Sequence, residues 1–190
     1  MKKSLGANTL AVPTPVWLVG TYDKEGKPNI ATVAWGGICS SDPPSVTVSL
    51  RKSRHSYDSI LERKAFTINV PSEAFVCQAD YAGIASGRDT DKFRAAGLTP
   101  VRSELVDAPY VAEFPLVLEC RLLQTVEVGI HTQFIGEIID VKAEESVIDA
   151  SGLLDATKVL PVVYSPATRT YYGLGAAIGK GFDIGKTLLK

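Results

Sequence analysis

The stretch FPLVLECRLLQTVEVGIHTQFIGEIIDVKAEE, Phe114 to Glu145, decides the fold of this chain. Two long runs of aliphatic and β-branched residues meet at Gly129, a pattern typical of a β-hairpin whose turn needs a permissive residue. The second run begins with His131, one of two histidines in the sequence. We therefore predict two long antiparallel strands with an ionisable ring at their turn. A half-exposed imidazole at a plain hairpin tip and an imidazole facing a ligand both fit this position.

Shorter strands are predicted before this hairpin. Residues 16–22 and 29–40 flank a turn that contains Asp, Gly and Pro, so they form a second hairpin. Residues 45–50 alternate apolar and polar side chains, residues 55–64 have helical spacing, and residues 65–70 return to a strand pattern. Because hairpins make most of these connections, we predict a mainly β protein with an antiparallel barrel and attached helices.

The remaining segments are less regular. Residues 73–97 have a loose helical pattern, residues 161–164 form a short strand, and a Gly-rich tail follows from about residue 166 to 190. The run GLGAAIGKG in this tail resembles a dinucleotide-binding glycine loop. Too few residues follow it for the helix and second strand that such a loop requires, so we reject that interpretation. We predict one domain over residues 1–190.

Composition excludes several classes of protein. The 190 residues carry a net charge of -1, which gives no reason to expect nucleic acid or an anionic membrane as partner. The three widely spaced cysteines contain no C-x-x-C pair, so we expect reduced thiols and no metal site. We find neither a signal peptide nor an apolar run of the roughly 20 residues that span a bilayer. The expectation is a soluble, cytoplasmic protein.

Residues 31–44, ATVAWGGICSSDPP, offer a surface for a flat ligand. Two glycines follow Trp35, and paired glycines in a strand are tolerated where the backbone bulges or where a ligand lies against the main chain. The indole adds a large stacking face, and the hydroxyls of Ser40 and Ser41 follow as further candidate contacts. A bulge with Trp35 in the core explains the same residues equally well.

A basic cluster at the end of residues 45–50 fits a phosphate. Arg51, Lys52, Arg54 and His55 precede a predicted helix, with Ser56 in its first turn. A helix N-terminus presents free N–H groups, and arginine matches phosphate oxygens in pairs. The alternative is a helix capped by a serine beside a solvated basic face, although the full capping box is missing.

A flat ligand with a phosphate suggests FMN, and the sequence resembles the flavin reductase-like family, especially its flavoredoxin branch. The resemblance covers residues 4–186 and rests on PTPVWLVGTYDKEGKPNIATVAWGGICSSDPP, DTDKFRAAGLTPV, APYVAEFPLVLECRLL and VGIHTQFIGEI. It implies an FMN-binding split β-barrel, a homodimer with flavin near the subunit interface, and electron transfer through the flavin.

The resemblance also assigns site residues. Trp35 matches an aromatic residue beside the isoalloxazine, and Ser56 matches a hydroxyl at the phosphate end, with Arg51 or Arg54 in the same cradle. Lys92 and Phe93 match a DKF motif, His131 matches the histidine of the turn, and Tyr164 matches an aromatic near the ring. We expect Lys92, His131 or both to contact the isoalloxazine and tune its potential, and His131 is the one possible catalytic residue. By composition alone, Lys92 reads as a surface lysine.

The sequence departs from the wider family at one position of this turn, and the difference bears on function. Reductases of the wider family commonly carry Gly-Asp-His at this turn, where the present chain has Gly129, Ile130 and His131. The missing carboxylate favours an electron-transfer flavoprotein over an NAD(P)H-dependent flavin reductase. A split-barrel module that holds flavin or haem without turnover is the third hypothesis. The expected partners are a second copy of the chain and either electron donor and acceptor proteins or NAD(P)H.

Overall fold

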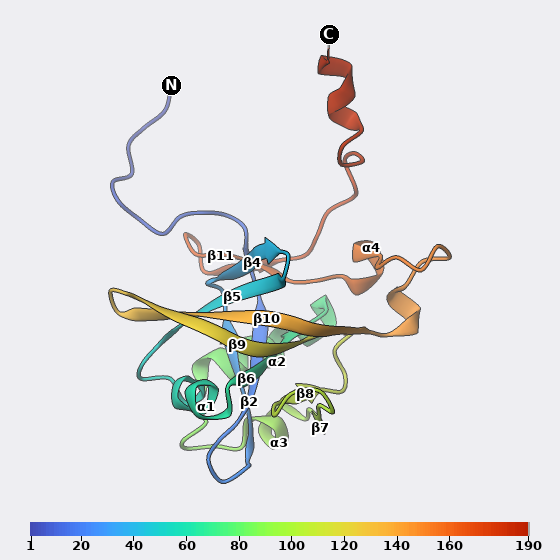
Figure 1. Cartoon of the computed structure of the whole chain (residues 1–190). Coiled ribbons are helices and arrows are strands. Elements are labelled where there is room, and N and C mark those ends of the chain that lie inside the picture. Colours follow the sequence, from blue (N-terminus) through green and yellow to red (C-terminus); the bar gives the residue numbers. More distant parts are fainter. Residues whose placement is uncertain (190) are drawn as a thin grey trace.

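A computed structural model describes residues 1–189 and places a seven-stranded antiparallel sheet at the centre of the molecule (Figure 1). Its strands run in the order β3-β2-β6-β9-β10-β5-β4. Their bounds are β2 Trp17–Tyr22, β3 Pro28–Val33, β4 Gly36–Ser41, β5 Pro44–Arg51, β6 Ala65–Val70, β9 Leu116–Val128 and β10 His131–Ala143. The predicted mainly β, antiparallel class is confirmed. The long hairpin of β9 and β10 turns at Gly129, whose φ of 56° lies in the left-handed region that favours glycine.

The sheet curls so that its two edges approach each other. The edge strands β3 and β4 follow one another along the chain, separated only by Ala34 and Trp35. The prediction of one continuous strand over residues 29–40 is therefore wrong. The chain leaves one edge of the sheet at Val33 and joins the other at Gly36, because β2 and β5 each need a partner strand. The result is a barrel that stays split between β3 and β4.

Two apolar cores occupy the two faces of this sheet. Successive residues of β2 point into different cores. Val19 packs with Phe66 and Phe134 inside the barrel, whereas Leu18 packs with Phe93 on the outer face. This period-two alternation is what a strand imposes on its side chains. Strand β2 is thus covered on both sides, which fixes the position of the helices that pack over it.

The helices lie on the outside of the barrel. They are α1 His55–Arg63, α2 Val76–Ile84, α3 Lys92–Ala96 and α4 Ala156–Val159, with short 3-10 turns η1 Glu73–Phe75, η2 Glu145–Val147 and η3 Ile184–Leu188. The helix predicted at 55–64 and the loose helical stretch at 73–97 are confirmed. No helix within residues 1–189 is long and apolar enough to cross a membrane.

Two small sheets complete the fold. One pairs β7 Pro100–Arg102 with β8 Pro109–Val111, and the other contains β1 Thr14–Pro15, β11 Val163–Ser165 and β12 Thr170–Tyr172. Because β12 pairs with β11, the Gly-rich tail begins near Gly173 and not near residue 166. Both terminal segments leave the body on the same side (Figure 1), and residue 190 lies outside the described residues.

Candidate functional site

A hollow of about 180 Å³, here the basic hollow, lies at the N-terminal end of α1. It is lined by Asn29, Ala31, Arg51, Ser53, Arg54, His55, Ser56, Ala85, Ser86, Gly87 and Lys92. These residues come from β3, from the end of β5 and its connection to α1, from the first turn of α1, from the loop between α2 and α3, and from the start of α3. Three of them are lysine or arginine, and among the described residues no Asp or Glu lines the hollow. Its chemistry fits an anion.

The N-terminal end of α1 borders this hollow, and such a helix end leaves N–H groups without an intrahelical partner. Strand β5 ends at Arg51, the N–H of Arg54 donates to the carbonyl of Arg51 at 3.0 Å, and Arg54 becomes the N-cap residue. No side chain of residues 1–189 caps this helix end, so the alternative of a serine cap is wrong. The first N–H groups of an uncapped nine-residue helix, with its positive dipole end, are suited to a bound anion.

Ser56 is fully buried at the back of the basic hollow. The side-chain amide of Asn29 donates to its oxygen at 2.9 Å, and the hydroxyl of Thr21 lies 3.4 Å from the same oxygen. Because the oxygen accepts both contacts, the Ser56 hydroxyl proton stays available for donation. Asn29 is a residue that sequence reasoning missed. Its signal was a polar side chain inside an otherwise apolar strand.

Lys92 is a buried ammonium rather than a surface lysine. Its side chain is 4% exposed, and Nζ donates to the carbonyls of Ile30 at 2.9 Å and Ala82 at 2.7 Å. Burial, and then the charge of Arg54, lower the pKa of Lys92 to about 8. An ammonium has three donors and two are used, so one remains for a ligand in the basic hollow.

A second hollow of about 270 Å³, the tryptophan hollow, adjoins the first. It is lined by Thr32, Val33, Ala34, Trp35, Ser49, Leu50, Arg51, Arg54 and His131. Trp35 is 36% exposed, so the alternative that places its ring in the core is wrong. His131 lies opposite Arg51 in the ladder between β10 and β5. Burial and then the Arg51 charge lower the pKa of His131.

Arg51 and Arg54 line both hollows and so join them. Each hollow alone is smaller than the roughly 300–1,000 Å³ of typical small-molecule sites, whereas the two together reach that range. One end offers cations and helix N–H groups, and the other offers an indole, an imidazole and main chain. The residues present therefore fit a ligand such as FMN, with a phosphate at one end and a flat ring at the other.

The connection between β5 and α1 is tied to the last turn of α2 and to the loop after it by two reciprocal contacts. Arg54 Nη1 donates to the carbonyl of Gly83 at 3.2 Å, and Arg88 Nη1 donates to the carbonyl of Ser53 at 2.6 Å. We call this pair of contacts the arginine clasp. It holds together the two segments that border the basic hollow. Sequence reasoning gave Arg88 no role.

Some predicted site residues lie elsewhere. Phe93 is 2% exposed and packs in the outer core, so its side chain serves packing, and it lines neither hollow. Tyr164 packs against Tyr171 with ring centroids 5.3 Å apart. Ser40 and Ser41 lie at the edge strand β4, and neither they nor Tyr164 line either hollow.

Lys92 and His131 are also separated. Lys92 lines the basic hollow and His131 the tryptophan hollow, so only His131 lies where the flat ring is expected. The reason is that α3 packs over β3, where Lys92 Nζ donates to the carbonyl of Ile30, 62 residues away in the sequence. The expectation that Lys92, His131 or both contact the isoalloxazine stays a prediction.

A larger hollow lies elsewhere on the described surface. It measures about 780 Å³ and is lined by Arg63 and residues 102–107. Glu104 and Asp107 belong to its lining, and Asp107 already pairs with Arg63 at 3.0 Å. This open hollow holds none of the predicted site residues, and its mixed charge does not fit a phosphate.

Comparison with known proteins identifies the family and the fold. Residues 9–171 match the model of the family described as flavin reductase like domain. Flavoredoxin of Desulfovibrio vulgaris (Miyazaki F) is 57% identical, with a TM-score of 0.94 over 97% of this chain and 100% of that chain. Flavoredoxin from Methanosarcina acetivorans is 30% identical, with a TM-score of 0.91 over 100% of both chains. A putative flavin reductase with split barrel domain from Shewanella frigidimarina NCIMB 400 is 26% identical, with a TM-score of 0.83 over 92% of this chain and 89% of that chain. The predicted split-barrel architecture is confirmed.

Proposed function

Because the chain belongs to the flavin reductase-like family, we propose that it binds FMN and transfers electrons through it, as a flavoredoxin-type protein. The observation that carries this proposal is the junction at Arg51 and Arg54. It joins a hollow suited to a phosphate with one suited to a flat ring. The similarity to two flavoredoxins along essentially the whole chain supports the same assignment.

The basic hollow would hold the phosphate. Lys92 contributes its third donor, Ser56 its hydroxyl proton, and the start of α1 its free N–H groups. Arg54 and Arg51 add charge and paired donors at the mouth. Charge-assisted hydrogen bonds of this kind are about twice as strong as neutral ones. Riboflavin, which has no phosphate, would use none of these groups.

The tryptophan hollow would hold the ring. When bound, FMN supplies the electron-transfer chemistry, and the protein determines how the ring is oriented and how easily it takes negative charge. The lowered pKa of His131 leaves its imidazole neutral at pH 7, so the charge at this rim comes from Arg51. A cation there favours the anionic, reduced ring, and Arg51 is thus expected to raise the midpoint potential.

We further propose a homodimer in which a second copy covers the exposed side of the tryptophan hollow. The register of the hairpin places Val128 opposite His131, and Val128 and Ile130 are 59% and 67% exposed. Apolar side chains next to a binding site are typical of an interface. Proteins or NAD(P)H remain the candidate electron donors, and a protein is the candidate acceptor.

An NAD(P)H-dependent flavin reductase is the second candidate. The similarity to the Shewanella frigidimarina protein favours it. Against it, Ile130 occupies the turn position that carries a carboxylate in reductases, and this side chain points into solvent without a charge. A flavin- or haem-binding module without turnover is the third.

The visible spectrum of the purified protein, with or without added FMN, is the first test. A flavin spectrum is expected, and its absence after addition of FMN would contradict the proposal. Rapid mixing with NADH and NADPH then separates the candidates, since fast bleaching would favour the reductase and slow bleaching the electron carrier. Analytical ultracentrifugation tests the dimer, which is expected to dissociate more readily in a Val128→Asp variant.

A further inference from the structure

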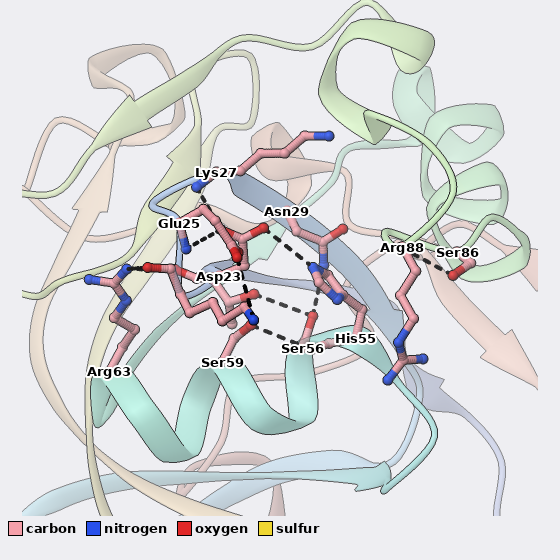
Figure 2. A network of polar contacts seen from close by, with 12 residues as sticks. Asp23, Glu25, Lys27, Asn29, His55, Ser56, Ser59, Arg63, Ser86 and Arg88 are labelled. Carbon is pink, nitrogen blue, oxygen red and sulfur yellow. Dashed lines mark hydrogen bonds and ion pairs between the residues drawn. The ribbon is translucent and has the colours of Figure 1, made fainter.

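The turn between β2 and β3 places one carboxylate oxygen beside the ring of His55, which lines the basic hollow. Oδ1 of Asp23 accepts the N–H groups of Glu25 at 3.1 Å and Lys27 at 2.8 Å, which fixes the side chain within its own turn. Arg63, at the far end of α1, donates to the carbonyl of Asp23 and holds the turn against the helix. Oδ2 is left to face His55, 3.8 Å from Nε2 (Figure 2).

The ring of His55 has a defined place in the basic hollow. It belongs to the first residue of α1, beside the free N–H groups, and its side chain is 23% exposed. The other side of the ring meets Gly87, where an added Cβ would lie 2.8 Å from His55 Cδ2 and 2.2 Å from Asn29 Oδ1. Figure 2 shows the imidazole with Asp23 on one side and the loop of Ser86 and Arg88 on the other. A carboxylate and a backbone thus orient a ring that lines a hollow for an anion.

We propose that His55, oriented by Asp23, is a phosphate-binding residue that gives the site its preference for FMN over riboflavin. This inference rests on the proposed function. A neutral imidazole has one N–H donor, whereas an imidazolium has two. Only the imidazolium can therefore face the Asp23 carboxylate with one N–H and donate to a phosphate with the other. Asp23 does not touch the ligand and is a positioning residue.

The other charges around this ring set the conditions for the test. They are Asp23 from the β2–β3 turn, Arg54 at the start of α1, Arg51 at the end of β5 and Lys92 from α3. All except Asp23 are cations that a phosphate must neutralise together with His55. The contribution of His55 is therefore measured as a difference between variants that keep the other cations.

The experiment compares the dissociation constants of FMN and riboflavin in the full-length apoprotein. In His55→Gln, FMN binding is expected to weaken about tenfold, while riboflavin binding stays within about twofold of wild type. Asp23→Asn keeps the oxygen that accepts the turn N–H groups and is expected to show a smaller loss, again for FMN alone. This loss should vanish when Asp23→Asn is combined with His55→Gln, because Asp23 acts through the ring.

Two further variants distinguish a loss of phosphate binding from a general structural effect of the substitution. Asp58→Asn removes an acid from the same helix outside the hollow and should leave both affinities unchanged. His55→Arg restores a cation and should recover the preference for FMN. Equal losses for both flavins, or none, would overturn the inference, while a wild-type protein that binds neither flavin would overturn the proposed function itself.

Discussion

The backbone N–H of Ser49 donates to the carbonyl oxygen of Trp35 at 2.8 Å, across the region where the barrel is split. This contact ties the link between β3 and β4 to β5, whose end carries Arg51. It fixes the backbone of Trp35, although 36% of the residue is exposed. The main chain is held by β5 while the ring lines the tryptophan hollow. Closure of the barrel and construction of the candidate site therefore depend on the same two-residue link.

The two tryptophans are predicted to respond differently to substitution. Trp35→Ala should weaken FMN binding by about 0.5–1.5 kcal/mol, the value of an aromatic contact beyond burial, with little effect on the melting temperature. Trp17 packs against the barrel core, so Trp17→Ala should destabilise the fold, by less than the roughly 3–5 kcal/mol of a fully buried tryptophan. Flavin titration and thermal unfolding of both variants measure this contrast. Full FMN affinity in Trp35→Ala would remove its ring from the site.

The adjacent glycines of β4, Gly36 and Gly37, are predicted to differ in how a substitution by alanine affects the stability of the fold. An added Cβ at Gly36 would lie 2.8 Å from the Thr47 carbonyl oxygen and 2.8 Å from the ring of Trp17, whereas at Gly37 it meets nothing within 4 Å. Gly36→Ala is expected to cost about 1–3 kcal/mol of unfolding free energy through overpacking. Gly37→Ala should be close to neutral. Chemical denaturation of both variants tests this, and equal effects would contradict the close approach at Gly36.

The buried ammonium of Lys92 predicts a pH dependence of FMN binding. Its pKa of about 8 in the free protein must rise when a phosphate binds, because an anion favours the charged form. Below about pH 8 the ammonium is charged in both states and affinity is at its highest. Above that value binding requires uptake of a proton, so affinity should fall as pH rises.

Titrations between pH 7 and 10 test this dependence. Lys92→Met should bind FMN more weakly at pH 7 and lose the alkaline decline, whereas Lys180→Met, in the exposed tail, should behave as wild type. A decline of the same size in Lys92→Met would assign the dependence to another group.

The arginine clasp is predicted to control how fast FMN leaves. Arg88 does not line the basic hollow, but its contact with the Ser53 carbonyl holds one border of that hollow. Loss of a hydrogen bond worth about 0.5–1.5 kcal/mol should let Arg88→Gln release FMN about 2- to 10-fold faster. Arg102→Gln, at the remote open hollow, is the matched control. Stopped-flow displacement with excess riboflavin measures the rate, and identical rates in both variants would exclude the clasp.

Much of the fold can be predicted from local sequence patterns. The two long strands around Gly129, the helix that begins at His55 and the strand at 65–70 are all predicted from periodicity and turn residues. Arg51, Arg54 and Ser56, which the sequence predicts to act together, line one hollow, the basic end of the candidate site. These features depend on neighbours in the chain, and so they can be read without the tertiary structure.

Other features depend on residues that are distant in sequence. No local signal shows that residues 29–40 divide between two edges of a sheet, because that break follows from the closure of the barrel. Composition makes Lys92 a surface lysine, and only the packing of α3 on β3 buries its ammonium between two carbonyls. The same packing brings Asn29 and Gly87 against the first turn of α1. The sequence by itself determined which elements form and which end of the site is basic. Tertiary structure decided which side chains share a hollow, because contacts between distant segments exist only once the sheet has curled.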